Sequence, residues 1–152
     1  QAHYRQAERV GYLRSALVTT SGLNEGDVRQ GKGRSDALAF AKWISALWQE
    51  NNDESGGFLA RPVKSGTFAM SMHALISAGN LRRAFLRSAK FYHLVNDGID
   101  FQLVEKGEEA HLILCIHAPA SEDLRVFYDD LLVLWLRWAS WMIDRPLLLN
   151  RV

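Results

Sequence analysis

The chain has 152 residues, of which 48% are hydrophobic, 23% charged and 11% aromatic, and its formal net charge is +1. This composition predicts one globular domain over residues 1–152 and excludes a disordered chain or a collagen-like repeat. Neither half of the sequence is a basic block, so the chain is a poor candidate for binding nucleic acid through phosphate charge.

The single cysteine and the apolar runs limit where the protein can reside. Cys115 is the only cysteine, which excludes an internal disulfide framework and suits a reducing, cytoplasmic compartment. The sequence begins with Gln1 and no leader follows, so we expect an excised piece of a longer protein. The most apolar run, Leu131 to Leu136, lies between charged residues. A membrane span needs about 20 mostly uncharged residues, so this run predicts a buried helix and no membrane partner.

The first half of the chain predicts two helices and glycine-rich loops. Apolar residues at three- and four-residue spacing favour a helix over residues 3–18. Several glycines then predict a polar loop over residues 22–33. Ser35 or Asp36 can cap a second helix that runs to about Gln49, and the composition of residues 51–57 is that of a loop.

The middle of the chain predicts two further helices and a hairpin. One helix follows Gly66 and ends before Gly79, and Asn80 can cap the next helix, which runs to about Asn96. The apolar pattern then changes to a period of two residues over 99–103 and 112–116. The turn residues at 106–109 join these two segments as a hairpin.

The end of the chain predicts a long helix and a third strand. Ser121 and the acidic residues after it can begin a helix that extends to Asp144 and is stopped by Pro146. Leu147 to Val152 resembles the start of another strand. The order of elements predicts an α+β fold, mostly helical, with a small antiparallel or mixed sheet of about three strands.

Motifs for nucleotide, metal and nucleophile chemistry are absent or incomplete. Gly26, Gly31 and Lys32 have the spacing of a phosphate loop, but the required serine or threonine is replaced by Gly33. His111 and His117 would lie roughly 20 Å apart on one strand, too far to share a metal ion. Cys115 lies in mid-strand, where a free cysteine acts as a small hydrophobe. We therefore predict no catalytic residue, no metal and no cofactor.

Two polar groupings on the helix over 81–96 have competing interpretations. His93 and Asp97 are four residues apart and could form an acid–base pair. We favour the alternative that Asp97 belongs to a turn and His93 faces solvent, because such pairs are ordinary surface features. A basic face predicts a solvated surface or a domain contact rather than a nucleic-acid site; it consists of Arg82, Arg83, Arg87 and Lys90.

Tryptophans recur at three-residue spacing on the last helix, at Trp135, Trp138 and Trp141, followed by Met142. This stripe can line an apolar pocket, form a dimer seam, or belong to the core. The helix is apolar nearly all round, so more than one of its faces must be covered. A pocket or an interface is therefore as well supported as a core role.

The sequence from Gly57 to Val152 carries a recognisable series of short patterns. They are Gly66 before a helix, Ala74-Leu75-Ile76-Ser77, Leu81 with Ala84, Tyr92 with Val95, the hairpin from Ile99 to Cys115, and Arg145-Pro146-Leu147. Together they resemble the effector-binding N-terminal domain of AraC-type bacterial transcriptional regulators, in the arabinose-binding subgroup. Asn80 stands where that family often has threonine, and both residues cap helices.

This resemblance implies a sensor and dimerisation module, with a small-molecule effector and a homodimeric parent protein. It also implies that DNA is bound only through a C-terminal pair of helix-turn-helix motifs, which this chain does not contain. The family does not fix the ligand residues, so our candidates come from aromatic and polar-tipped side chains on the helices expected to cover the sheet. They are His73, Tyr92, His93, Trp135 and Trp138. A ligand-free dimerisation module and a small enzyme, for which the sequence offers no motif, are the alternatives.

Overall fold

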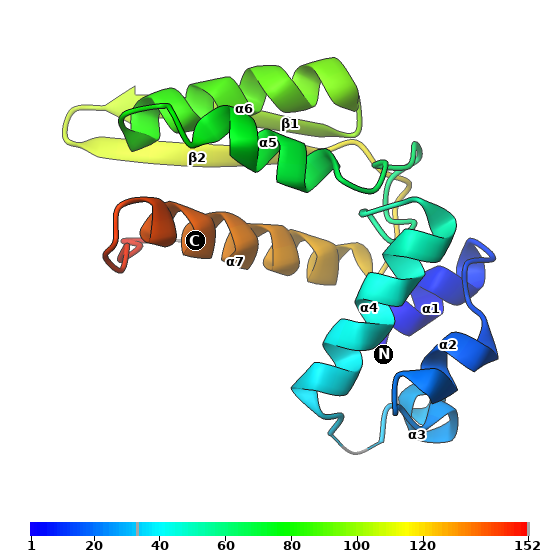
Figure 1. Cartoon of the computed structure of the whole chain (residues 1–152). Helices are drawn as coiled ribbons and strands as arrows, with labels where there is room; N and C mark the ends of the chain where they lie inside the picture. The colour runs from blue at the N-terminus through cyan, green and yellow to red at the C-terminus, as the bar shows by residue number, and fades with distance from the viewer. Residues whose placement is uncertain (33, 152) are drawn as a thin grey trace. The chain divides into compact units, whose positions relative to one another are not determined.

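The computed structural model describes residues 1–32 and 34–151, and within them it has seven helices and one two-stranded sheet (Figure 1). The α+β fold class is therefore confirmed. Gly33 and Val152, which belong to the phosphate-loop comparison and to the predicted third strand, lie outside the described residues. The chain forms two compact units. The first unit contains residues 1–68 and 118–123, and the second contains residues 69–117 and the chain from 124 onward.

The first unit begins with two short helices where one was expected. The helices are α1 (Ala2–Arg9) and α2 (Ser15–Thr20), so the prediction of a single helix over residues 3–18 is wrong. Gly11 has a φ of 77°, which a glycine adopts without steric cost. The backbone N–H groups of Tyr12 and Leu13 both donate to the carbonyl of Ala7, and these bonds close α1.

A third helix, α3 (Glu25–Gln30), occupies part of the predicted glycine-rich loop. The Asn24 side chain accepts a hydrogen bond from the Asp27 N–H at 3.1 Å, and Gly31 ends the helix in the left-handed conformation. The loop prediction is therefore wrong over Glu25–Gln30. The reason is that the capping residues were present but the apolar period that signals a helix was not.

The fourth helix, α4 (Ala37–Asn51), agrees with the prediction. Asp36 is its cap, because the carboxylate accepts a hydrogen bond from the Ala39 N–H at 3.0 Å. The helix contributes to the core of the first unit, which also includes residues from α1 and α2 and from the turn after α2. The buried members are Tyr4, Ala7, Leu17, Val18, Leu23, Ala39, Trp43, Ile44 and Leu47.

The loop that follows α4 is organised around one buried carboxylate. Asp53 is 1% exposed, and its Oδ1 accepts hydrogen bonds from the Ser55 N–H, the Ser55 hydroxyl and the Val63 N–H at 2.7–2.9 Å. Its Oδ2 accepts from the Gly57 N–H at 2.9 Å. Burial raises the pKa of Tyr12, and the Asp53 carboxylate raises it further. This network fixes a segment whose amino-acid composition alone predicted only a loop.

A second carboxylate of the first unit, Asp123, is held by two arginines of α1. Its side chain is 3% exposed and accepts hydrogen bonds from Arg5 and Arg9, with the Arg9 Nη2 at 3.0 Å. The hydrogen bond from Arg5, opposed by burial and aided by the charges of both arginines, lowers the pKa of this carboxyl below its usual value. The sequence predicted that Asp123 supports the start of a helix, and did not indicate this pairing.

The lowered pKa of Asp123 makes the stability of the protein depend on pH. A carboxyl whose pKa is depressed in the folded state stabilises that state above the pKa of the unfolded chain, which is about 3.9 for aspartate. This contribution is lost as the pH falls through the folded-state value. We expect Asp123→Asn to be less stable than the unmodified chain at pH 7, with a difference that shrinks below about pH 4. Urea denaturation of both proteins from pH 7 to pH 2 tests this, and a difference that stays constant over that range would contradict it.

The second unit contains the sheet and three helices. The helices are α5 (Thr67–Leu75), whose first two residues belong to the first unit, α6 (Leu81–Val95) and α7 (Leu124–Met142). Asn80 caps α6 as predicted, since its side chain accepts a hydrogen bond from the Arg83 N–H at 2.9 Å. Figure 1 shows α6 running along the hairpin, and α7 is drawn below the hairpin in the same general direction.

The hairpin is also confirmed. Strand β1 (Ile99–Lys106) pairs antiparallel with β2 (Glu109–Ile116), with Ile99 opposite Ile116 and Lys106 opposite Glu109. Gly107, in the two-residue turn, has a φ of 61°, as such turns require. Residues 147–151 do not form the predicted third strand, because no segment of the described chain pairs with them.

An aromatic cluster forms the core of the second unit. The ring centroid of Trp135 on α7 lies 4.8 Å from the centroid of Phe101 on β1 and 5.9 Å from that of Tyr92 on α6. It lies 5.2 Å from the ring centroid of Trp138 on the same helix. Phe85 on α6 completes the cluster, 5.7 Å from Trp138 and nearly perpendicular to it. Such edge-to-face pairs add to the stabilisation that burial provides. In the described residues no helix has both the length and the apolar character for crossing a membrane.

Candidate functional site

The second unit contains a largely apolar cavity of about 680 Å³. Pockets that bind drug-sized ligands range from about 300 to 1,000 Å³. Five consecutive residues of β2, from Ala110 to Leu114, line this cavity. Successive strand residues point to opposite faces, so the cavity runs along the edge of β2 rather than over one face of the sheet.

Four segments of the second unit besides β2 form the walls, and most of their side chains are apolar. Leu81 and Phe85 come from α6, and Leu103 comes from β1. The α7 wall consists of Tyr128, Leu132, Trp135, Leu136 and Ala139, and the last wall consists of Leu147, Leu148, Leu149 and Arg151. Trp135 is 2% exposed overall, so the cavity touches only a small part of its surface.

A charged pair lies at the rim of this cavity. The Arg82 Nε donates to both carboxylate oxygens of Glu105, at 3.0 and 2.9 Å, and the two side chains are 60% and 49% exposed. His111 also lines the cavity, and its Nε2 is 3.4 Å from a carboxylate oxygen of Glu109. Exposed ion pairs of this kind contribute little to folding stability, which leaves their charges available for interaction with a ligand.

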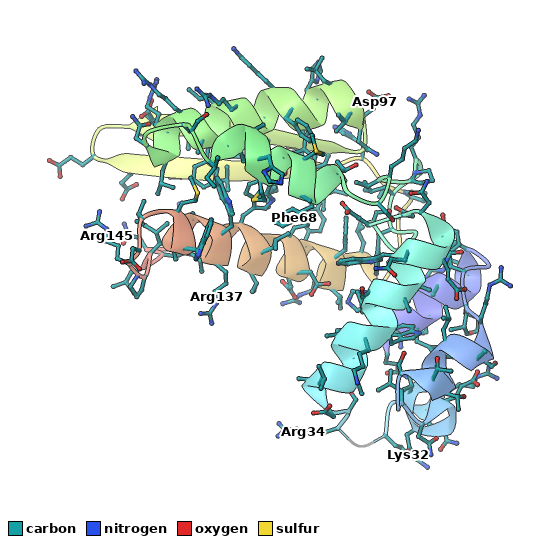
Figure 2. The ribbon with its side chains drawn as sticks, viewed as in Figure 1. Lys32, Arg34, Phe68, Asp97, Arg137 and Arg145 are labelled. Atoms are coloured by element: carbon teal, nitrogen blue, oxygen red, sulfur yellow. The ribbon has the colours of Figure 1, made fainter. Side chains whose placement is uncertain are left out.

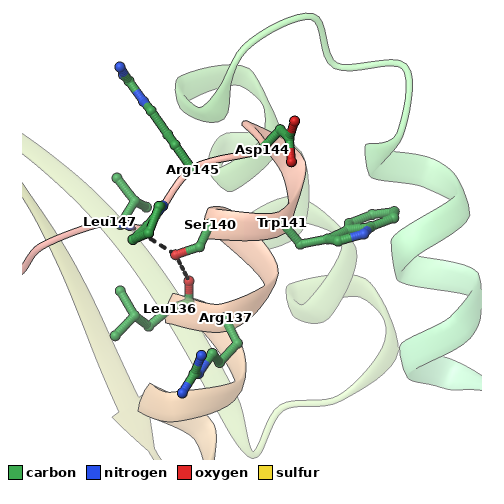
Figure 3. Close-up of a pocket in the computed structure, with 8 residues that line it drawn as sticks. Leu136, Arg137, Ser140, Trp141, Asp144, Arg145 and Leu147 are labelled. Atoms are coloured by element: carbon green, nitrogen blue, oxygen red, sulfur yellow. Dashed lines mark hydrogen bonds between the residues drawn. The ribbon is translucent and has the colours of Figure 1, made fainter.

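The C-terminal wall is fixed by a serine near the end of α7. The Ser140 hydroxyl donates to the Leu136 carbonyl at 2.8 Å and accepts from the Leu147 N–H at 3.1 Å (Figure 3). These bonds set the direction in which the chain leaves α7. A second cavity of about 460 Å³ surrounds this turn and is lined by Leu136, Arg137, Ser140, Trp141, Asp144, Arg145, Pro146 and Leu147.

The structure separates the five residues predicted to bind ligand. Trp135 lines the larger cavity, whereas Tyr92 and Trp138 are buried in the aromatic cluster behind it. His73 and His93 are exposed and line neither of the two cavities. The preferred interpretation of the His93–Asp97 pair is confirmed, since His93 is exposed and Asp97 lies in a turn.

Sequence reasoning missed most of the lining residues. The alternation that places Leu103, Leu112 and Leu114 on one face of the hairpin was visible, but it predicted only a strand facing the core. Arg82 was assigned to a solvated basic face, and its partner Glu105 is 23 residues away in the sequence. No local pattern could have indicated that the residues after Pro146 line the same cavity as β2.

The tryptophan stripe of α7 is divided between the core and an exposed surface. Trp135 and Trp138 are buried, and Trp141 is 69% exposed. Val133 and Leu134 are exposed on the same helix, and Figure 2 shows Arg137 pointing away from it. One face of α7 therefore belongs to the core, and another face, on which Arg137 lies among Val133, Leu134 and Trp141, remains exposed in the second unit. No group of three or more histidine, cysteine or acidic side chains in the described residues is arranged to hold a metal ion.

Comparison with known families assigns the chain to a class of bacterial regulatory domain. The model of the N-terminal arabinose-binding domain of AraC transcription regulators matches residues 11–152. The chain therefore belongs to this family, and the resemblance that its sequence showed from Gly57 onward extends through most of the first unit. No curated protein and no solved structure matches the chain.

Proposed function

We propose that this domain senses a small molecule, which binds in the larger cavity of the second unit and controls an attached DNA-binding domain. The observation that best supports this proposal is a cavity of about 680 Å³ with largely apolar walls, in a domain that belongs to a regulatory family. A ligand regulates only if it binds one arrangement of the protein better than another. Here the ligand would contact β2, α7 and the C-terminal segment together, so it can favour the arrangement in which they enclose it.

Among the five residues predicted from the sequence to bind ligand, Trp135 is the one that we propose contacts it. Its indole forms part of the cavity wall, and Tyr92 and Trp138 hold it in position from behind. We do not include His73 and His93 in the proposed site, because both are exposed and neither lines either of the two cavities. Their positions also give no support to the enzyme alternative, which requires a base beside a nucleophile or carboxylate in a cleft.

The test is a thermal-shift screen against amino acids, polyamines, sugars, fatty acids and aromatic acids. A ligand at about 100 times its dissociation constant should add about 2.7 kcal/mol of stability. We expect Leu112→Trp, which fills the cavity from β2, to abolish the shift. Gln102→Trp is the matched control, because Gln102 is exposed on the opposite face of the hairpin. A shift that survives in Leu112→Trp would place the site elsewhere, and a folded chain without any response would contradict the sensor.

We also propose that the exposed face of α7 pairs with a second copy of the chain. The observation in favour is the exposure of Trp141, Val133 and Leu134 on one helix, since exposed apolar patches of this kind mark contact surfaces. The buried Trp138 is not part of that surface. A seam there would bury Trp141 in an interface core, where aromatic residues are enriched.

Trp141→Asp is therefore expected to give folded monomers, because it places a charge in the proposed seam. Light scattering measures the mass, and circular dichroism checks the fold. Trp138→Asp is the contrasting variant and should unfold the second unit, because it buries a charge in the aromatic cluster. A monomeric unmodified chain, or a Trp141→Asp variant that stays dimeric, would show that this face is not the seam.

A further inference from the structure

We infer that the ligand of the larger cavity is an amphipathic carboxylic acid, with an apolar body along β2 and α7 and its carboxylate at Arg82. This inference rests on the proposed function and specifies the class of ligand. It also departs from the name of the family, which refers to a sugar.

The walls of the cavity favour an apolar body. Of the residues that line it, only Arg82, Glu105, His111, Tyr128 and Arg151 carry polar side chains, and the rest are leucine, isoleucine, alanine, phenylalanine and tryptophan. A sugar carries a hydroxyl on nearly every carbon, and each hydroxyl buried without a partner costs binding energy. A hydrocarbon chain or an aromatic ring has no such requirement and gains from leaving water.

The rim supplies the site for the acid. Arg82 uses only its Nε toward Glu105, and in the described part of the chain its two terminal nitrogens make no hydrogen bond. The planar guanidinium can therefore present these two nitrogens as a fork to a second carboxylate. Arg82 lies two residues after Asn80, the cap of α6, at the same end of that helix as Leu81, which also lines the cavity. An acid bound there keeps its charge at the exposed rim while its body enters the cavity.

The other charged groups around the cavity leave the balance in favour of an anion. Glu105 repels a carboxylate, and its charge and that of Arg82 offset each other, so the net positive charge of the lining comes from Arg151. Arg151 adds a second positive charge from the C-terminal wall, and His111 lies beside Glu109 on β2. A cationic ligand would have to compete with Arg82 for Glu105 and would face Arg151 as well.

Four probes with the full 152-residue chain test the inference: decanoate, decanol, decylamine and L-arabinose, each below its aggregation concentration. Tryptophan fluorescence and calorimetry give the affinities. We expect decanoate to bind about tenfold more tightly than decanol, a difference of about 1.4 kcal/mol, and decylamine and arabinose to bind more weakly than either. The contribution is modest because Arg82 is exposed at the rim.

Arg82→Gln should remove the preference for decanoate and leave decanol binding within twofold. Arg83→Gln is the matched control, because Arg83 is exposed next to it on α6 and does not line the cavity. Equal affinity for decanoate and decanol, tighter binding of decylamine or arabinose, or an Arg82→Gln variant that keeps the preference would each overturn the inference. If no probe binds but the wider screen finds another ligand blocked by Leu112→Trp, this class of ligand is wrong and the sensor stands. If no compound binds at all, the proposed function itself fails.

Discussion

Trp135→Ala is expected to lower the free energy of unfolding by about 3–5 kcal/mol, the range for removing a large buried aromatic side chain. Trp135 is almost completely buried and its ring contacts four others, from α6, β1 and α7. Its removal leaves a void at the point where these elements meet. The surrounding rings cannot close this void without breaking their own edge-to-face contacts.

Urea denaturation followed by far-UV circular dichroism measures this loss. Leu94→Ala provides the control, because it removes an apolar side chain from an exposed position on α6, outside both the cavity and the proposed seam. That variant should change the stability of the monomer by less than about 0.5 kcal/mol. If both variants lost the same stability, the aromatic cluster would not be the core of the second unit.

Asp53→Ala is expected to cost about 3 kcal/mol, because it leaves several buried donors without an acceptor. The N–H groups of Ser55, Gly57 and Val63 all donate to this one carboxylate. Asp53→Asn should cost less, because the amide keeps one oxygen for the donors that now bond Oδ1. The Gly57 N–H would still lose its acceptor, because the NH₂ group of the asparagine is itself a donor.

Hydrogen exchange is the sharpest measurement for Asp53, because it follows the individual amides. Those of Ser55, Gly57 and Val63 should lose protection in Asp53→Ala, and those of the hairpin in the second unit should keep it. A matched comparison is Asp36→Ala, which removes a carboxylate that caps α4 and should cost only about 1 kcal/mol. If the order of the two costs were reversed, the loop network would contribute less than a single helix cap.

The elements that the sequence predicted correctly share a local cause. The cap residues Asp36 and Asn80, the turn at Gly107 and the alternation in β1 each act over a few neighbouring residues, so their effect can be found without the fold. The errors also share a cause. Residues 3–18 keep an apolar period across Gly11, where the backbone turns, and α3 has caps but almost no apolar face.

The candidate site was less predictable, because it is assembled from distant segments. Trp135 could be identified, since a tryptophan stripe on an apolar helix is a recognisable signal. Arg82 and Glu105 are 23 residues apart in the sequence, and the segment after Pro146 lines the same cavity as β2 only because of where α7 ends. His73 and His93 are candidates only by their residue type and their place on helices expected to cover the sheet, and their exposure in the structure separates them from the buried Trp135.

If the cavity holds a ligand as proposed, the hydrogen bond between Leu147 and Ser140 would couple its occupancy to the path of the chain after α7. Leu147, Leu148 and Leu149 are at once a wall of the cavity and the backbone that leads away from α7. A ligand that contacts this wall would stabilise the one direction in which the chain leaves α7 when the wall is closed. Linkage is reciprocal, so any force that holds or displaces this segment from outside changes the affinity for the ligand by the same factor. In the proposed sensor, a partner that holds the C-terminal segment from outside would therefore change the affinity for the ligand without entering the cavity.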